Sequence, residues 1–271
     1  MASQTSQPLI VLVVGASSGI GEATAKAFAA RGHKVYGTSR DRKRVKLGNV
    51  DALSLDVFDE TSMIKAAERV IEIEGRIDGM VYSAGFYCAG GVEETPLKDV
   101  EDQFQAYFFG AVRMAQIVLP YMREQKFGRL MFMSSTAGAI AIPFHAAYSA
   151  SKGALGRWTE ALAYELKAFN IQASYVEAGA INTNAPDAMR PPQLPMAEYH
   201  ERRENAELAF KAALAKGLPP SAIGDAIVAA FESPKPRVRY RVGKEGKVFP
   251  VLRALLGETL FRGLISKSFK I

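Results

Sequence analysis

The sequence predicts an α/β fold, a doubly wound parallel sheet within one domain that covers residues 1–271. Short apolar runs alternate with longer helical patterns along most of the chain. Such alternation is typical of βαβ units, whose helices cover both faces of a parallel sheet. A hydrophobic content of 48% over 271 residues suits one large domain with a substantial core. Ligands of such a sheet are expected outside the carboxyl ends of its strands.

Seven short runs, most of them rich in β-branched residues, predict strands at 9–14, 34–38, 50–55, 79–82, 129–134, 172–176 and 237–242. Longer patterns between them predict helices at 19–31, 61–74, 100–124, 147–169, 197–216 and 219–232. The stretch 184–195 holds four prolines and is expected to be irregular. We therefore interpret 184–218 as an insertion over the strand ends that serves as a substrate lid; a surface loop without function is the alternative.

The bulk composition excludes several classes of protein. The net charge of +6 is uneven, because residues 235–271 hold ten Lys/Arg and two Glu (+8) and the remainder sums to −2. A basic tail on a near-neutral domain does not predict a nucleic-acid partner. No apolar run approaches the ~18 residues of a membrane span. The lone Cys88 excludes an internal disulfide and favours a reducing, cytoplasmic location.

The tail itself, residues 245–271, mixes spaced Lys/Arg with eight large apolar residues: Phe249, Leu252, Leu255, Leu256, Leu260, Phe261, Leu264 and Ile265. This pattern suits a basic amphipathic helix that contacts a membrane surface, or a flap over an apolar substrate. A tail that packs on its own domain is the third interpretation.

A glycine-rich turn follows the first predicted strand and opens the first helix. It reads Gly15-Ala-Ser17-Ser18-Gly19-Ile20-Gly21, a G-x-x-x-G-x-G spacing. Glycines let the backbone approach a pyrophosphate closely, and a helix N-terminus offers unpaired N–H groups. Tight turns use the same residues, but the place between strand and helix favours a Rossmann-type dinucleotide site.

The end of the second strand indicates which dinucleotide binds. Arg40 stands about 19 residues past Gly21, where an acidic side chain would accept hydrogen bonds from the ribose of NAD. An arginine there pairs with a 2′-phosphate instead. Asp41 lies one position further on, and Arg42, Lys43, Arg44 and Lys46 add positive charge. We predict NADP(H) as the cofactor; a solvated basic loop is the alternative.

Tyr148 and Lys152 lie four residues apart in a predicted helix, so they share one face. An ammonium beside a phenol lowers the tyrosine pKa, as a proton-transfer catalyst requires. The same spacing occurs at Tyr240 and Lys244, but that pair falls on a predicted strand and turn, where the side chains would not meet.

Five motifs follow one another in a set order: the glycine loop, Asp56, Ala84-Gly85, Ser134-Ser135 and Tyr148-x-x-x-Lys152. Over about residues 9–183 this order resembles the short-chain dehydrogenase/reductase superfamily. Within it the chain is most similar to the 17β-hydroxysteroid-dehydrogenase-like group, through residues 109–113, 143–144 and 240–243. The resemblance implies an oxidoreductase that moves a hydride between NADP(H) and a carbonyl/alcohol pair. It also implies a homodimer or homotetramer formed through the helices near 100–124 and 147–169.

The resemblance further implies a role for each matching position. The catalytic residues are Ser135, which binds the substrate oxygen, Tyr148, which exchanges the proton, and Lys152, which binds the nicotinamide ribose. The cofactor-binding residues, besides the glycine loop and Arg40, are Asp56, Val57, Ala84, Gly85, Tyr148, Lys152, Gly179, Ile181 and Thr183. Apolar residues of the lid and tail predict a steroid, retinoid or lipid-like substrate; they are Met189, Met196, Leu208, Phe210 and Phe249.

Three departures from the family pattern stand out. Tyr82-Ser83 replaces the usual Asn-Asn, Ala178 replaces a proline, and Tyr107 occupies the position of the catalytic asparagine that helps to hold a water beside the lysine. An alternative function is therefore an NADP(H)-binding scaffold or sensor with impaired catalysis. His33, His145 and His200 have no ligand spacing and read as ordinary surface or loop residues, so no metal site is expected.

Overall fold

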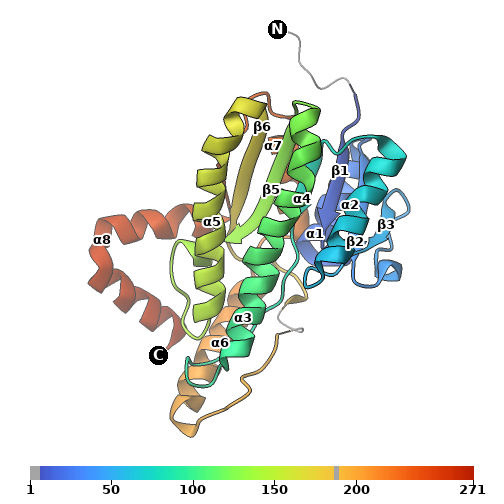
Figure 1. Cartoon of the computed structure of the whole chain (residues 1–271). Coiled ribbons are helices and arrows are strands. Elements are labelled where there is room, and N and C mark those ends of the chain that lie inside the picture. Colours follow the sequence, from blue (N-terminus) through green and yellow to red (C-terminus); the bar gives the residue numbers. More distant parts are fainter. Residues whose placement is uncertain (1–6, 186–188) are drawn as a thin grey trace.

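The computed structural model describes residues 7–185 and 189–271. Seven parallel strands form one sheet in the order β3-β2-β1-β4-β5-β6-β7 (Figure 1). Their bounds are β1 (Ile10–Val14), β2 (Lys34–Ser39), β3 (Asp51–Ser54), β4 (Gly79–Tyr82), β5 (Gly128–Ser135), β6 (Ile171–Ala178) and β7 (Arg239–Val242). The predicted doubly wound sheet is confirmed, with every predicted strand in place. Its order reverses between β1 and β4, which is where such sheets open a ligand crevice.

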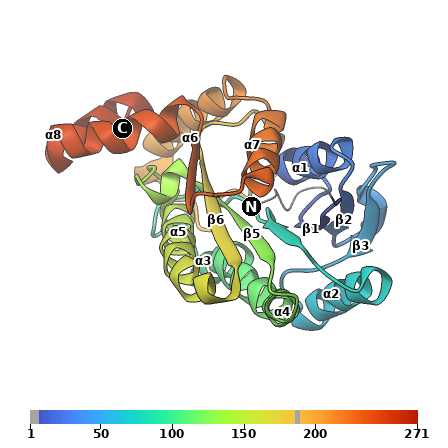
Figure 2. The ribbon, with the colours of Figure 1, turned by 90° about the horizontal axis from the view of Figure 1, so that it is seen from above.

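Eight α-helices connect and cover the strands: α1 (Gly19–Ala30), α2 (Glu60–Glu74), α3 (Leu97–Phe104), α4 (Gly110–Glu124), α5 (Ala146–Leu166), α6 (His200–Ala215), α7 (Pro220–Glu232) and α8 (Lys244–Phe269), counted over the described residues. Figure 2 shows α2, α4 and α5 on one face of the sheet and α1 and α7 on the other. Two apolar cores result, because successive strand residues point to opposite faces. In β1, Leu12 and Val14 join one core, whereas Val11 and Val13 join the other.

The single helix predicted over 100–124 is wrong in one respect. Residues Gln105–Phe109 form a π-helical segment between α3 and α4. Tyr82 explains part of this local change, because its hydroxyl donates a 2.7 Å hydrogen bond to the Ala106 carbonyl oxygen. Gly110 makes room for that phenol, since a Cβ at this position would lie 2.2 Å from the Tyr82 oxygen. π-Helical turns of this kind are often found at functional sites.

The segment 184–218, which the sequence predicts to be a lid, begins as an irregular stretch and continues as a short 3₁₀ turn, Ala197–Tyr199, and α6. Residues 186–188 of this segment lie outside the described residues. Glu94 anchors this region to the body of the domain. Its buried carboxylate accepts a 3.0 Å hydrogen bond from the Met196 amide and pairs with Arg203 of α6. This segment is thereby tied to the loop that follows β4.

The tail forms α8, which is kinked at Gly257 (φ 73°) into a first arm, residues 244–256, and a second arm, residues 258–269. Phe261 and Ile265 of the second arm pack against Ile140 in a small core of their own. Apolar side chains therefore lie both on the packed side and on the exposed side of the arms.

Candidate active site

One cavity of about 750 Å³ opens at the carboxyl ends of β1, β4, β5 and β6. It gathers sixteen of the seventeen site residues predicted from the sequence: Gly15, Ser17, Ser18, Gly19, Ile20, Arg40, Asp56, Val57, Ala84, Gly85, Ser135, Tyr148, Lys152, Gly179, Ile181 and Thr183. These positions are spread over more than 160 residues of sequence, and the parallel strands bring them to one edge of the sheet. The remaining residue, Gly21, does not line the cavity.

The glycine loop has the geometry of a phosphate cradle. Gly15 and Gly19 adopt left-handed φ values of 86° and 58°, which other residues rarely adopt. A Cβ on Gly15 would lie 2.9 Å from the Ala84 backbone. Gly21 acts by packing, because a Cβ there would lie 2.0 Å from the Gly15 carbonyl oxygen. Within the described chain, Ser18 makes no capping hydrogen bond at the start of α1, so the first-turn N–H groups suit an anionic ligand.

Two guanidinium groups stand near the end of β2, beside this loop. Arg40 and Arg44 line the cavity, whereas Asp41 does not. The Asp41 carboxylate instead accepts a 3.0 Å hydrogen bond from the Lys43 amide and caps the short 3₁₀ turn Arg42–Arg44. The loop therefore presents cations to the cavity and uses its own carboxylate for local structure.

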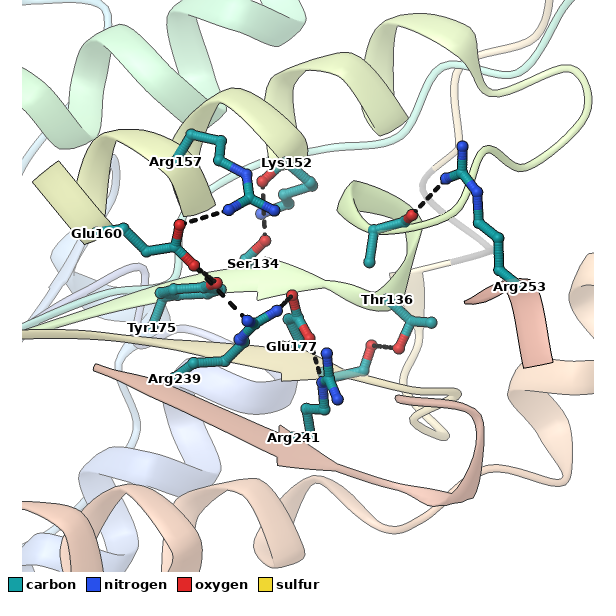
Figure 3. Close-up of polar contacts among 12 residues, drawn as sticks. Ser134, Thr136, Lys152, Arg157, Glu160, Tyr175, Glu177, Arg239, Arg241 and Arg253 are labelled. Carbon is teal, nitrogen blue, oxygen red and sulfur yellow. Dashed lines mark hydrogen bonds and ion pairs between the residues drawn. The ribbon is translucent and has the colours of Figure 1, made fainter. Parts of the chain in front are cut away.

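The side chains of Ser135, Tyr148 and Lys152 meet deeper in the cavity. Ser135 ends β5, and its hydroxyl accepts a 3.1 Å hydrogen bond from the Ala137 amide. Tyr148 and Lys152 lie on the first turns of α5, and each is 5% exposed. Ser134 fixes α5 to the sheet, because its hydroxyl donates a 2.9 Å hydrogen bond to the Lys152 carbonyl oxygen (Figure 3). In the second Tyr-x-x-x-Lys pair, by contrast, Tyr240 lies on β7 as predicted, whereas Lys244 begins α8 where a turn was expected.

Tyr148 belongs to a cluster of three phenols. Its hydroxyl oxygen lies 3.2 Å from that of Tyr87, and the Tyr107 ring meets its ring edge-on at 5.3 Å between centres. Burial raises the pKa of Tyr148, while hydrogen bonds with Ser135 and Tyr87 act in the opposite direction. The expectation that Lys152 lowers the pKa of this phenol is not met here, since only Ser135 and Tyr87 lower it.

The Lys152 ammonium has two close partners. It donates a 2.5 Å hydrogen bond to the Met133 carbonyl oxygen and lies 3.9 Å from the centre of the Tyr107 ring. Its distance from the centre of the Tyr148 ring is longer, 5.8 Å. Burial lowers the pKa of Lys152 to about 7. Part of the Lys152 side chains are therefore neutral near pH 7. The charged form depends on stabilisation by the groups around it.

Comparison with known proteins identifies the family. The family model described as short chain dehydrogenase matches residues 9–193 of this chain. The chain belongs to this family. Its members are oxidoreductases, which agrees with the resemblance derived from the motifs.

Two relatives and one solved structure resemble this short-chain dehydrogenase. A 3-ketodihydrosphingosine reductase of Bacteroides thetaiotaomicron is 40% identical over 181 residues, 67% of each chain. Estradiol 17-beta-dehydrogenase 1 of Rattus norvegicus is 32% identical over 251 residues, 85% of this chain and 72% of the relative. The crystal structure of a short-chain dehydrogenase from Streptomyces avermitilis matches with a TM-score of 0.85 and 30% identity, covering 97% of this chain and 99% of that one.

The structure of this short-chain dehydrogenase links two of its departures from the family pattern. Tyr107 is buried, and its hydroxyl donates a 2.6 Å hydrogen bond to the Phe86 carbonyl oxygen. Tyr82 bonds the same π-helical segment, at the Ala106 carbonyl oxygen. The two tyrosines therefore stabilise one local structure together.

Sequence reasoning missed several residues of this short-chain dehydrogenase that face the substrate side. Tyr87 follows the Ala84-Gly85 motif closely, and that position was the only available signal for it. Of the apolar lid and tail residues expected to line the cavity, Phe210 and Phe249 do so, whereas Met189, Met196 and Leu208 do not. Ile142 and Ile265 line it in addition. His145 is buried against Phe210, at 4.4 Å between ring centres, and is therefore no surface histidine.

Across residues 7–185 and 189–271, no three His, Cys, Asp or Glu side chains gather in a way that could hold a metal ion. No helix in the same ranges is both long and apolar enough to cross a membrane.

Proposed function

We propose that the protein is an NADP(H)-dependent oxidoreductase that interconverts a carbonyl and an alcohol on a hydrophobic substrate. One observation carries the proposal: the Tyr148 hydroxyl, the Ser135 hydroxyl and the Lys152 ammonium line the same cavity as the glycine loop. A dinucleotide cradled by that loop along the cavity and a substrate oxygen bound near Tyr148 would share one enclosed space. Proximity of this kind is a main source of rate enhancement in enzymes.

The bound dinucleotide would supply or accept the hydride. The N–H groups at the start of α1 would hold its pyrophosphate, and Gly179, Ile181 and Thr183 would border its nicotinamide end. Ser135 would hydrogen-bond the substrate oxygen and orient it. Tyr148 would donate its hydroxyl proton to that oxygen during reduction and take the proton back during oxidation. Lys152 would bind the nicotinamide ribose and hold a positive charge near the phenol oxygen as the proton leaves.

Arg40 and Arg44 favour the phosphorylated dinucleotide. Guanidinium groups bind phosphate in two-pronged hydrogen bonds, and both side chains line the cavity beside the glycine loop. Neither Arg40 nor Arg44 takes part in an ion pair among the described residues, so both are available for a 2′-phosphate.

The substrate side of the cavity favours an apolar molecule. Its wall beyond Tyr148 includes Tyr87, Ile142, Phe210 and Phe249. Aromatic and aliphatic walls with a few polar groups at one end are typical of sites for hydrophobic ligands. Relatives named after a ketodihydrosphingosine and after estradiol support a lipid-like or steroid substrate over a polar one; a retinoid fits the same description.

The alternative is a scaffold or sensor that binds NADP(H) with impaired catalysis. Tyr107 motivates it, because the tyrosine hydroxyl is already bonded to Phe86 and the ring, not a polar group, faces Lys152. The presence of Ser135, Tyr148 and Lys152 in one cavity favours the enzyme. The Tyr107→Asn variant separates the two, since a large gain in turnover would indicate that the native residue impairs the proton path.

The direct test mixes the purified protein with NADPH and a panel of steroid, retinoid and long-chain carbonyls, and follows the loss of nicotinamide absorbance. We expect turnover with at least one member. Tight NADPH binding without turnover on any of them would favour the scaffold.

We also infer that the protein is a homodimer or homotetramer. Exposed apolar residues on the α4 and α5 side of the molecule support this, notably Phe109, Tyr164 and Phe169. Light scattering on the purified chain measures the state directly, and a monomer at micromolar concentration would exclude it.

A further inference from the structure

The two arms of α8 carry an exposed apolar surface that the domain does not use. Val248, Val251 and Leu255 are spaced three and four residues apart along the first arm, so they form one stripe. Leu260 and Leu264, four residues apart, form a second stripe along the second arm. All five are exposed, Leu255 by 77% and Leu260 by 66%. Large aliphatic side chains gathered in this way mark an interaction surface.

Positive charge accompanies both stripes. Lys244 and Lys247 stand beside the first stripe, and Lys267 lies three residues past Leu264, on the line of the second. Residues 244–271 hold six Lys/Arg and two Glu, a net charge of +4. Among the described residues, Arg253 pairs with Glu258, whereas these three lysines make no ion pair. The exposed surface is therefore apolar along its two stripes and cationic beside them.

We propose that the two stripes dock α8 onto the surface of an anionic phospholipid bilayer. Leucine and valine side chains on a helix that lies in the interface enter the boundary between head groups and acyl chains. Lysines beside them bind the anionic head groups. A second copy of this chain is a poorer occupant, because pairing α8 with itself would bring two surfaces of net charge +4 together.

The position of α8 fits this role. The kinked end of α8 projects from the body of the molecule (Figures 1 and 2), and the second arm returns from it to pack against Ile140. The packed side of the same helix supplies Phe249, Ile265 and Phe269 to the cavity wall. Docking therefore sets the cavity beside the bilayer, where apolar molecules dissolve. The docking itself does not depend on the proposed chemistry.

Co-sedimentation of the full chain with vesicles tests the proposal. One set contains phosphatidylcholine with phosphatidylglycerol, and the other contains phosphatidylcholine alone. We expect binding to the anionic set that weakens with added salt. The double variant Leu255→Asp/Leu260→Asp should lower partitioning on the order of 100-fold, because two leucines no longer enter the bilayer. Lys244→Gln/Lys267→Gln should lower it about 25-fold, at roughly fivefold for each lysine.

The matched control is Leu97→Asp, which changes an equally exposed leucine (71%) at the start of α3. It should bind vesicles as the unchanged protein does. Circular dichroism and NADPH binding of each variant report folding and the cofactor site separately from docking. The proposal is overturned if the unchanged protein ignores anionic vesicles, or if Leu255→Asp/Leu260→Asp binds them as well as Leu97→Asp does. It is also overturned if the α8 variants turn an oligomer into a monomer without any vesicle binding, since the occupant would then be a second copy.

Discussion

The ammonium nitrogen of Lys152 lies 3.9 Å from the centre of the Tyr107 ring, so the cation faces an aromatic surface where the family has an asparagine. The Met133 carbonyl oxygen, at 2.5 Å, is its hydrogen-bond acceptor. A desolvated cation over an aromatic face gains about 1 to 2 kcal/mol. We therefore expect the Tyr107 ring to position Lys152.

Replacing the ring tests this role. Tyr107→Leu removes the aromatic face, so the pKa of Lys152 should fall by about one unit. The alkaline limb of the kcat/KM profile for NADPH, which reports groups of the free enzyme, should move to lower pH by the same amount. Tyr107→Phe keeps the ring and loses only the hydrogen bond to Phe86, so its limb should stay in place. If the alkaline limbs of the Tyr107→Leu and Tyr107→Phe profiles fall at the same pH, the ring does not act on Lys152.

Buried Lys152 also predicts how stability depends on pH. Its pKa is about 7 in the folded protein, below the ordinary value of 10.5. The unfolded chain therefore binds more protons between pH 7 and 10.5, and the free energy of unfolding rises with pH across that window. From pH 7 to 9 the rise should be roughly 2 kcal/mol. Denaturant unfolding of Lys152→Met should show a smaller rise of the unfolding free energy between pH 7 and 9. If the rise is as large in the variant as in the unchanged protein, it comes from other groups.

Cofactor choice depends on the end of β2. Arg40→Asp replaces a phosphate-binding cation with a carboxylate that repels the 2′-phosphate and accepts hydrogen bonds from a ribose. The ratio of kcat/KM for NADPH to that for NADH should fall by at least about tenfold, the equivalent of one charge-assisted hydrogen bond. Lys46→Asp, a charge reversal of the same size just beyond the 3₁₀ turn, is the control. An unchanged ratio in Arg40→Asp would refute the role of this arginine.

The buried pair of Glu94 and Arg203 should hold the lid in place. Glu94→Gln leaves Arg203 of α6 without its counter-charge in a buried site, which typically costs about 3 kcal/mol of unfolding free energy. Denaturant unfolding and limited proteolysis across 189–199 measure the effect. The control is Glu93→Gln, which changes the exposed neighbour that accepts a hydrogen bond from the Tyr199 hydroxyl. It should alter the free energy of unfolding by no more than about 0.5 kcal/mol and leave the proteolysis pattern unchanged. Equal behaviour of both variants would mean that the pair does not anchor the lid.

Much of the fold could be predicted because periodicity and glycine placement are local signals. The strands from β1 to β7 and the glycine loop were all readable in this way, and parallel strand order then brought distant motifs to one cavity. The π-helical segment could not be predicted, since it depends on Tyr82, which is separated from Ala106 by 24 residues. The phenol cluster was missed for the same reason. Tyr87 reaches Tyr148 only through the tertiary fold, 61 residues apart in sequence. Likewise, α8 has apolar side chains on two sides, and sequence pattern alone does not tell which side packs.

The proton-transfer role of Tyr148 is the central claim, and the Tyr148→Phe variant tests it most directly. Phenylalanine keeps the ring that packs against Tyr87 and Tyr107 and removes only the hydroxyl. With a carbonyl substrate found in the panel, turnover should fall at least about 100-fold, the usual contribution of a general acid, while the NADPH dissociation constant stays within about threefold. Turnover by Tyr148→Phe at the rate of the unchanged protein, with NADPH bound, would contradict the account.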